Sequence, residues 1–323
     1  MASLRDLLRA ATVLLVSLPA QAQPQPQPPL TVTFPSADPQ TDVSPSESRA
    51  LDALASPSAE KPPTRRWRWR RFSTEEYVVT GAAMAMSVGA LLIKPSPGRW
   101  NGGVLVDEDA RRQLRLDDYL AERRARDASD VLLAATLATP VLADAVATAG
   151  WYHRSPDVAQ QMLLIDAEVL AVTTGVHGLV AGVVSRERPY GRNCGTELSP
   201  ESLECRRNER YRSFFSGHSA TAFAGASLMC IHHQELSLYG GGVPDAVACG
   251  AGYAAATATA TLRVVGDMHY VSDVVVGAAW GTIAGLGLPW FFHYRVADAD
   301  SRRSTAELHL VPYPGGISFG GTF

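Results

Sequence analysis

Six apolar segments rich in alanine and glycine follow residue 73 of this chain of 323 residues. They cover residues 77–93, 129–149, 162–184, 219–231, 246–265 and 274–294. Loops with proline, glycine and charged residues separate them, and they do not show the strict alternation of apolar and polar residues that indicates a half-buried strand. The pattern predicts an all-α fold, a bundle of six main helices.

A capping box marks the expected start of this bundle. Ser73 stands three residues before Glu76, an arrangement that satisfies backbone donors at a helix N-terminus. We therefore expect the helical domain to cover residues 73–295. The tail, residues 296–323, ends in glycine-rich turns, and we expect a short strand or an extended segment there without a chemical role.

Residues 1–22 have the three parts of a secretory signal peptide. Two arginines precede an apolar run, and Ala20–Ala22 offers a small-x-small cleavage site. Because the run is shorter than the roughly 20 residues of a membrane span, we expect a cleaved signal before an uncleaved anchor. Export places the chain in an oxidising compartment, where disulfides persist.

Four cysteines fit that compartment. Cys194 and Cys205 lie in one polar loop, and we predict that they form a disulfide. Cys230 and Cys249 lie in apolar segments, where buried free thiols are the first interpretation and a second disulfide is the alternative.

Residues 23–72 are predicted to be a disordered linker, because proline, glutamine, serine and alanine bury too little apolar surface to offset chain entropy. The linker ends in a run at 65–72 with five arginines and two tryptophans. Such a run suits an anionic membrane surface, and a solvated domain edge is an equal alternative. The net charge of −3 gives no support for nucleic-acid binding.

The distribution of acidic residues gives evidence both for and against a membrane-embedded bundle. Segments 246–265 and 274–294 are long enough to span and almost free of acidic residues. Segments 129–149 and 162–184 carry acids that are costly in lipid. Those acids are Asp130, Asp144, Asp166 and Glu168. We slightly favour a membrane-associated bundle, with a soluble or peripheral one as the alternative.

Three polar clusters lie at the ends of apolar segments. They contain Arg186 and Arg188 in the first, Ser216, Gly217 and His218 in the second, and Arg263, His269 and Asp273 in the third. A guanidinium group can donate hydrogen bonds to two phosphate oxygens at once. The free backbone N–H groups at the start of a helix bind anions. A carboxylate four residues after a histidine shares its helix face and can hold one imidazole nitrogen as a donor, which leaves the other as a nucleophile.

The order and spacing of these clusters resemble the superfamily of type 2 phosphatidic acid phosphatases and vanadium-dependent haloperoxidases. That family's pattern is Lys, six residues, Arg-Pro; then Pro-Ser-Gly-His; then Ser-Arg, five residues, His, three residues, Asp. This chain has Arg188-Pro189, then Ser216-Gly217-His218, then Arg263 with His269 and Asp273 at the same intervals. Three positions depart from it: Ala181 replaces the lysine, Phe215 the proline and Leu262 the serine.

The resemblance implies a six-helix domain and a phosphatase that needs neither a metal nor another cofactor. His269 would be the nucleophile and form a phosphohistidine, Asp273 would orient it, and His218 would protonate the leaving oxygen. The phosphoryl oxygens would be bound by Arg188, Arg263, Ser216 and the Gly217 N–H group. Arg186 is expected to compensate for the missing lysine at position 181.

The expected substrate is a lipid phosphate, such as phosphatidic acid, phosphatidylglycerol phosphate, undecaprenyl pyrophosphate or a lipid A phosphate. The expected location is the bacterial cell envelope, with a site that faces the periplasm. Two alternatives remain. A vanadate-dependent haloperoxidase would use the same oxyanion pocket, and Ala181 leaves room for a catalytically weak or silent envelope protein that binds partners on this scaffold.

Overall fold

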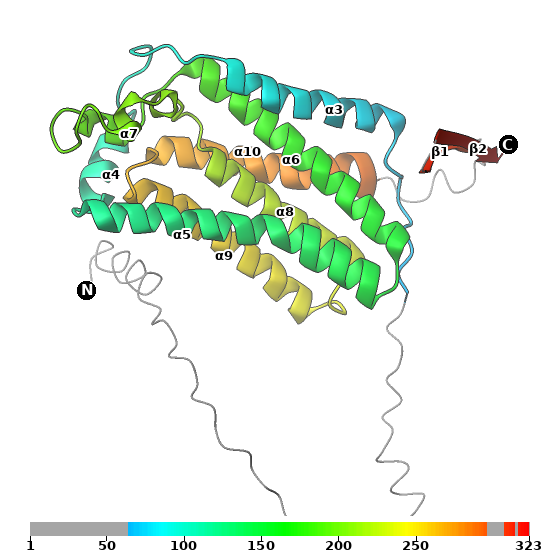
Figure 1. Cartoon of the computed structure of the whole chain (residues 1–323). Helices are drawn as coiled ribbons and strands as arrows, with labels where there is room; N and C mark the ends of the chain where they lie inside the picture. The colour runs from blue at the N-terminus through cyan, green and yellow to red at the C-terminus, as the bar shows by residue number, and fades with distance from the viewer. Residues whose placement is uncertain (1–63, 296–306, 314–315, 323) are drawn as a thin grey trace, which may run out of the picture. The chain divides into compact units, whose positions relative to one another are not determined.

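The computed structural model describes residues 64–295 and the backbone of residues 307–313 and 316–322 (Figure 1). The predicted signal peptide, most of the predicted linker and residues 296–306 lie outside the described residues.

Six long helices form the bundle within residues 64–295. They are α3 (Thr74–Gly89), α5 (Tyr119–Ala138), α6 (Pro156–Val184), α8 (Gly217–Leu236), α9 (Val243–Val265) and α10 (Val271–Pro289). Three of them continue as η1 (Ala90–Leu92), η2 (Thr139–Tyr152) and η5 (Trp290–Tyr294). The predicted all-α bundle is confirmed, and each of the six apolar segments lies within one helix and its continuation, apart from Ile93, which follows η1.

Shorter elements fill two of the connections. They are α4 (Asp107–Leu114), η3 (Pro189–Asn193), α7 (Leu203–Arg206) and η4 (Asn208–Tyr211). The C-terminal tail forms an antiparallel hairpin of β1 (Glu307–Tyr313) and β2 (Gly316–Thr322), in which Glu307 pairs with Thr322.

Local sequence sets where the helices begin and end. Ser73 caps α3 through the expected capping box with Glu76. Helix α6 ends at Ser185, whose left-handed φ of 55° stops the helical run directly before Arg186. The Ser216 side chain caps α8, and the backbone N–H of Tyr270 donates to Asp273 at the start of α10. These boundaries put the three polar clusters at helix ends.

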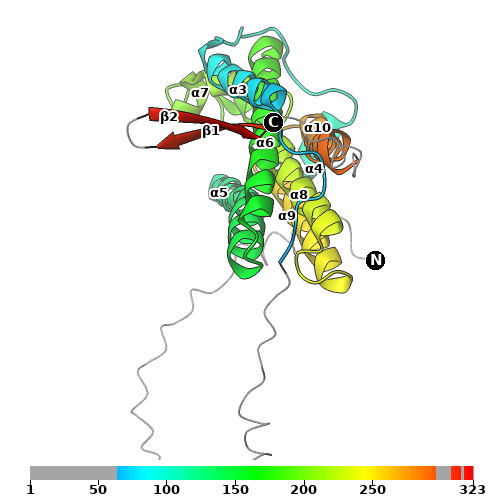
Figure 2. The ribbon, with the colours of Figure 1, turned by 90° about the vertical axis from the view of Figure 1, so that its right-hand side faces the viewer.

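Helix α8 lies at the centre, where it packs against α5, α6, α9 and α10 (Figure 1, Figure 2). A stripe of glycines on α10, Gly277, Gly281 and Gly285, permits close approach to α8. A Cβ atom at Gly281 would lie 2.0 Å from the carbonyl oxygen of Ala220. The small residues of the sequence therefore serve helix–helix contact, as they commonly do in membrane bundles.

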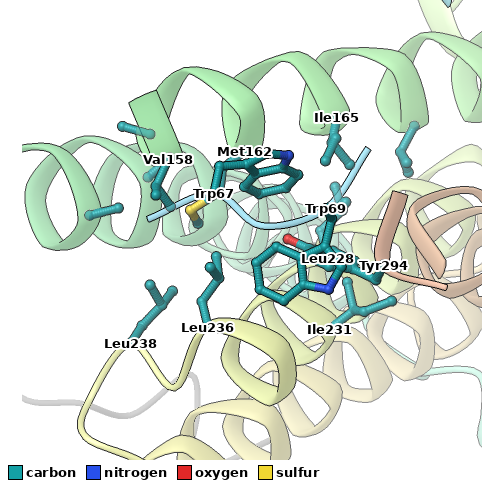
Figure 3. Close-up of a cluster of buried hydrophobic side chains, with 14 of the residues drawn as sticks. Trp67, Trp69, Val158, Met162, Ile165, Leu228, Ile231, Leu236, Leu238 and Tyr294 are labelled. Carbon is teal, nitrogen blue, oxygen red and sulfur yellow. The ribbon is translucent and has the colours of Figure 1, made fainter. Parts of the chain in front are cut away.

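The arginine and tryptophan run packs onto the core of the bundle (Figure 3). Trp67 and Trp69 are only 9% and 8% exposed, and the ring of Trp69 lies 5.0 Å from that of Tyr294. Arg66 and Arg68 are exposed, because alternate residues of an extended segment point to opposite sides. Neither interpretation made from the sequence, a membrane-surface run or a solvated edge, describes the two tryptophans.

Three helices in the described part of the chain are long and apolar enough to cross a membrane: Tyr119–Tyr152, Pro156–Val184 and Val271–Tyr294. Helix α9, which we expected to be a candidate, is not among them; its run of alanines and threonines is less apolar. The segments that seemed too acidic qualify by length and composition. Three of their four acids, Asp144, Asp166 and Glu168, are buried, whereas the Asp130 side chain is 58% exposed. Asp166 contacts His232 at 2.9 Å, and Asp144 contacts His233 at 3.3 Å.

Candidate active site

The three polar clusters meet where α6 ends and where α8 and α10 begin. Arg188 lies in the loop after α6, Ser216 and His218 flank the first residue of α8, and His269 lies two residues before α10. Contacts join the clusters across long stretches of sequence. The Arg188 guanidinium lies 3.1 Å from His269, and Arg263 contacts His218.

The imidazole of His269 is held at both nitrogens. Nδ1 lies 2.8 Å from the carbonyl oxygen of Ser213, which can only accept, so Nδ1 carries the proton. Nε2 therefore has the free lone pair, and Nη1 of Arg188 donates to it at 3.1 Å. A fixed tautomer with an unprotonated Nε2 is the form that a nucleophile needs.

Burial, and then the charge of Arg188, lower the pKa of His269 to about 3. The side chain is only 2% exposed, so its protonated form loses most of its hydration. His269 is consequently neutral across the physiological pH range.

Asp273 lies behind His269 at a distance of 3.7 Å between its Oδ2 atom and Nδ1. That separation is too long for a hydrogen bond, so the Ser213 carbonyl fixes the imidazole directly. The carboxylate accepts from the Ser213 hydroxyl at 2.6 Å and from the Tyr270 backbone at 3.0 Å. Its position supplies negative charge close to the imidazole.

Arg186 faces away from the expected phosphate position. Its side chain is fully buried and donates to Asp273 at 2.5 Å and to Asp107 at 2.8 Å. The remaining nitrogen, Nε, donates to the Gly102 carbonyl oxygen. The expectation that Arg186 compensates for Ala181 does not fit these contacts, because all three nitrogens already have protein acceptors. Arg186 instead fixes Asp273.

Two other guanidinium groups do face the site. Arg188 is positioned by the carbonyl oxygens of Glu209 and Met268, at 2.8 and 3.2 Å. Arg263, near the end of α9, has a buried Nε atom without a hydrogen-bond partner in residues 64–295. Burial lowers the pKa of Arg263 to about 10, which still leaves it charged at neutral pH. Both groups are therefore cationic donors.

His218 opens toward solvent, with a side chain that is 33% exposed. Its Nε2 atom lies 2.8 Å from a carboxylate oxygen of Asp130 on α5, and the same oxygen contacts Arg263. Burial and the neighbouring Arg263 lower the pKa of His218 to about 2 in the free protein. The Asp130 carboxylate thus contacts both Arg263, expected to bind the phosphoryl oxygens, and His218, expected to protonate the leaving oxygen.

The first turn of α8 forms the floor of the site. The Ser219 hydroxyl donates to the Ser216 hydroxyl at 3.0 Å. Gly217 lies directly against the imidazole of His177 from α6, so a Cβ atom at Gly217 would be 2.5 Å from its Nε2 atom. Only glycine allows this approach of α8 to α6.

Two disulfides are present. Cys194–Cys205 links η3's end to α7, with a Cα–Cα distance of 5.8 Å, in the loop that also supplies the Glu209 carbonyl oxygen. Cys230–Cys249 joins α8 to α9. The interpretation of Cys230 and Cys249 as free thiols is wrong, because adjacent packing of these helices brings the two residues together.

Three residues of the site were not found in the sequence. Asp130 attracted notice only as an acid that argued against a membrane helix, and His177 stands in an apolar helix without a motif. Ser213 acts partly through its backbone carbonyl, which residue identity does not encode. The sequence offered one signal for these residues. His177 lies one helical turn before Ala181, the residue that replaces the family's lysine.

Comparison with known proteins agrees with this geometry. Residues 163–297 match the model of the PAP2 superfamily. A segment of 73 residues is 44% identical to the lipid A 1-phosphatase of Porphyromonas gingivalis; it makes up 23% of this chain and 15% of that protein. The chain thus spans only a small part of that relative's length. No solved structure matches the chain.

The superfamily match covers α8, α9 and α10 and all but the beginning of α6. These helices supply or flank Arg188, His218, Arg263 and His269, which the structure brings together at one end of the bundle. The part of the chain that matches the PAP2 superfamily, residues 163–297, thus contains all three motifs and these side chains, which converge at the site.

Proposed function

We propose that the chain is a phosphatase that hydrolyses lipid phosphate monoesters or pyrophosphates through a phosphohistidine at His269. One observation carries the proposal: the Ser213 carbonyl fixes Nδ1 of His269, and Nε2 presents its lone pair beside Arg188. A neutral nucleophile next to a fixed cation suits attack on phosphorus, because the cation stabilises the charged oxygens.

The reaction has two steps. Nε2 of His269 attacks phosphorus, the bond from phosphorus to the leaving oxygen breaks, and His218 gives that oxygen a proton. Water then attacks the phosphohistidine, His218 takes a proton from the water, and the N–P bond breaks to release inorganic phosphate. Arg188 and Arg263 bind the non-bridging oxygens in both steps, together with Ser216 and the Gly217 N–H group.

The proton of His218 depends on the substrate. In the free protein burial, and then the charge of the nearby Arg263, hold the pKa of His218 low. A bound phosphate brings negative charge to the same place, which opposes that effect and raises the pKa of His218. The phosphate must also displace Asp130 from Arg263 and His218, since the carboxylate contacts both.

A lipid substrate is favoured by the apolar surface next to the site. The site lies at the end of α6 and the start of α10, both candidate membrane spans. Leu179 and Val183 on α6 are 41% and 50% exposed, and Val275 on α10 is 60% exposed. Acyl chains can pack along these side chains while the headgroup reaches Arg188.

The location follows from the same features. Disulfides persist in an oxidising compartment, and Cys194–Cys205 lies in the loop beside the site. We therefore place the protein in the bacterial envelope, associated with the inner membrane, with its site facing the periplasm.

The missing lysine predicts weaker catalysis. Ala181 is buried and offers no donor. Loss of one charged donor typically costs about 3 kcal/mol of transition-state stabilisation. The two arginines remain, so we expect a slower phosphatase and not a silent scaffold.

The test is phosphate release from purified protein in detergent. The panel should contain phosphatidic acid, phosphatidylglycerol phosphate, undecaprenyl pyrophosphate, lipid A and soluble phosphate esters. We expect release from at least one lipid, loss of that release in His269→Ala, and retention in His309→Ala, a histidine of the C-terminal hairpin. Unchanged release by His269→Ala would refute the mechanism, and no release from any substrate would support the silent alternative.

A further inference from the structure

A cluster of three buried side chains lies at the end of the bundle opposite the proposed phosphatase site. Glu76 comes from α3, Glu168 from the middle of α6 and His293 from η5. The 24 residues of Val271–Tyr294 separate this cluster from His269, which is roughly 36 Å at the rise of a helix. The cluster takes no part in the chemistry described above.

One donor atom of each side chain points to a common centre. The three residues are 5%, 2% and 0% exposed. Oε1 of Glu76, Oε2 of Glu168 and Nε2 of His293 lie within 4.8 Å of one another. Each of these atoms lacks a hydrogen-bond partner of acceptable geometry within residues 64–295. Buried polar atoms nearly always have a hydrogen-bond partner, so three such atoms that face one another without a partner require an explanation.

The surroundings prepare these atoms as ligands. Nδ1 of His293 lies 3.2 Å from the carbonyl oxygen of Arg70, which can only accept, so the lone pair of the neutral ring is on Nε2. A backbone carbonyl on the other imidazole nitrogen is the usual support of a metal-binding histidine. The second oxygen of Glu76 is occupied by the Ser73 N–H group at 2.6 Å. Oε1 of Glu76 is thereby left to face the centre.

The spacing fits a metal ion. Ligands at about 2.05 Å from a tetrahedral zinc ion lie roughly 3.3 Å from one another. Nε2 of His293 is 3.2 Å from Oε1 of Glu76 and 4.0 Å from Oε2 of Glu168. Oε2 of Glu168 lies within 4.8 Å of Oε1 of Glu76, so a shift of at most about 1.5 Å by Glu168 would complete the set.

A proton is the competing occupant. Arg70 contacts Glu76 at 3.3 Å and offsets one carboxylate charge, so a single proton on His293 would balance the other. That proton can form one hydrogen bond, however, and would leave Oε2 of Glu168 buried without a partner. A metal ion that accepts several ligands would satisfy all three atoms.

We propose that Glu76, Glu168 and His293 bind one divalent transition-metal ion, with Zn²⁺ as the first candidate. One imidazole and two carboxylates are donors that zinc accepts, and a fourth position commonly holds water. The ion joins α3, α6 and η5, three segments far apart in sequence. Its role is to fasten the beginning of the bundle to its end, independently of the proposed phosphatase activity.

The experiment uses the full chain in detergent, stripped with a chelator and then dialysed against Zn²⁺. Bound zinc is measured by mass spectrometry and the melting temperature by scanning calorimetry. We expect one zinc per chain and a rise in Tm of about 5 to 10 °C at a hundredfold excess over Kd. Stripped protein titrated with Co²⁺ should develop visible absorption bands that Zn²⁺ abolishes.

Variants locate the site. Glu168→Gln and His293→Asn should lose the zinc and the rise in Tm. His232→Asn is the matched control, because His232 is an equally buried imidazole paired with a carboxylate, Asp166. It should retain the zinc, as should His269→Ala, which separates this site from the proposed catalytic one. Wild-type protein that binds no zinc or cobalt, or zinc retained by a folded His293→Asn variant, would overturn the proposal without affecting the phosphatase.

Discussion

Replacement of Gly217 by alanine should disturb the floor of the proposed active site through a single contact. The added Cβ atom would lie 2.5 Å from Nε2 of His177, against an ordinary contact of about 3.5 Å, so the imidazole or α8 must move by about 1 Å. Overpacking of this kind costs about 1 to 3 kcal/mol. A displacement of that size at a catalytic site costs on the order of a hundredfold in rate.

The assay compares the melting temperature and kcat/KM for a lipid phosphate. We expect Gly217→Ala to lower Tm by about 2 to 8 °C and kcat/KM by about a hundredfold. Gly250→Ala in α9 is the matched control, because a Cβ atom there meets nothing within 4 Å. That control should leave activity unchanged and should be neutral or stabilising, by up to about 1 kcal/mol.

A double variant isolates the cause. If the clash with His177 is responsible, Gly217→Ala should cost much less Tm in a His177→Ala background than in the wild type. An equal loss in both backgrounds, or a Gly217→Ala protein with wild-type stability and rate, would refute this account of the floor.

Three further predictions concern the charge, the cross-link and the titration of the site. Arg188→Leu should lower kcat by about 10²- to 10³-fold, because it removes a cationic donor that contacts His269, whereas Tm should change little. Cys194→Ser with Cys205→Ser should reduce the free energy of unfolding by about 2 to 3 kcal/mol in urea titrations, since the bond closes a loop across 11 positions. The pKa of His269 is about 3 in the folded protein and 6.5 unfolded, so its contribution to stability is complete above pH 6.5 and declines as the pH falls toward 3. Histidine NMR should show at least two imidazoles that remain neutral at pH 4, those of His218 and His269, of which one is missing from His269→Asn. Protonation of the imidazole assigned to His269 near pH 6.5 would contradict the structure.

Much of the fold was accessible from sequence because its signals are local. The capping box at Ser73 and the apolar periodicity of the six segments each depend on neighbouring residues. The spacing of the motifs similarly identified Arg188, His218, Arg263 and His269, which the structure brings to one end of the bundle.

The features that the sequence did not predict depend on contacts between residues far apart in the chain. Asp166 and Glu168 looked unfavourable for a membrane helix, yet each faces a buried histidine from a distant segment. Arg186 stands two residues before Arg188, but the turn after α6 points it toward Asp273 and away from the site. In the run at 65–72, apolar and charged residues alternate over only eight positions, five of which are arginine. The sequence therefore did not predict the burial of Trp67 and Trp69.

The most direct measurement of the proposed mechanism is capture of the covalent intermediate. An aryl phosphate labelled with ³²P, whose leaving group needs no proton, should be mixed with the protein and quenched in alkali, where phosphohistidine survives. The account predicts up to one label per chain on the peptide that contains His269, accumulation of that label in His218→Asn, and none in His269→Asn. Label on another residue, or turnover by His269→Asn at the wild-type rate, would contradict it.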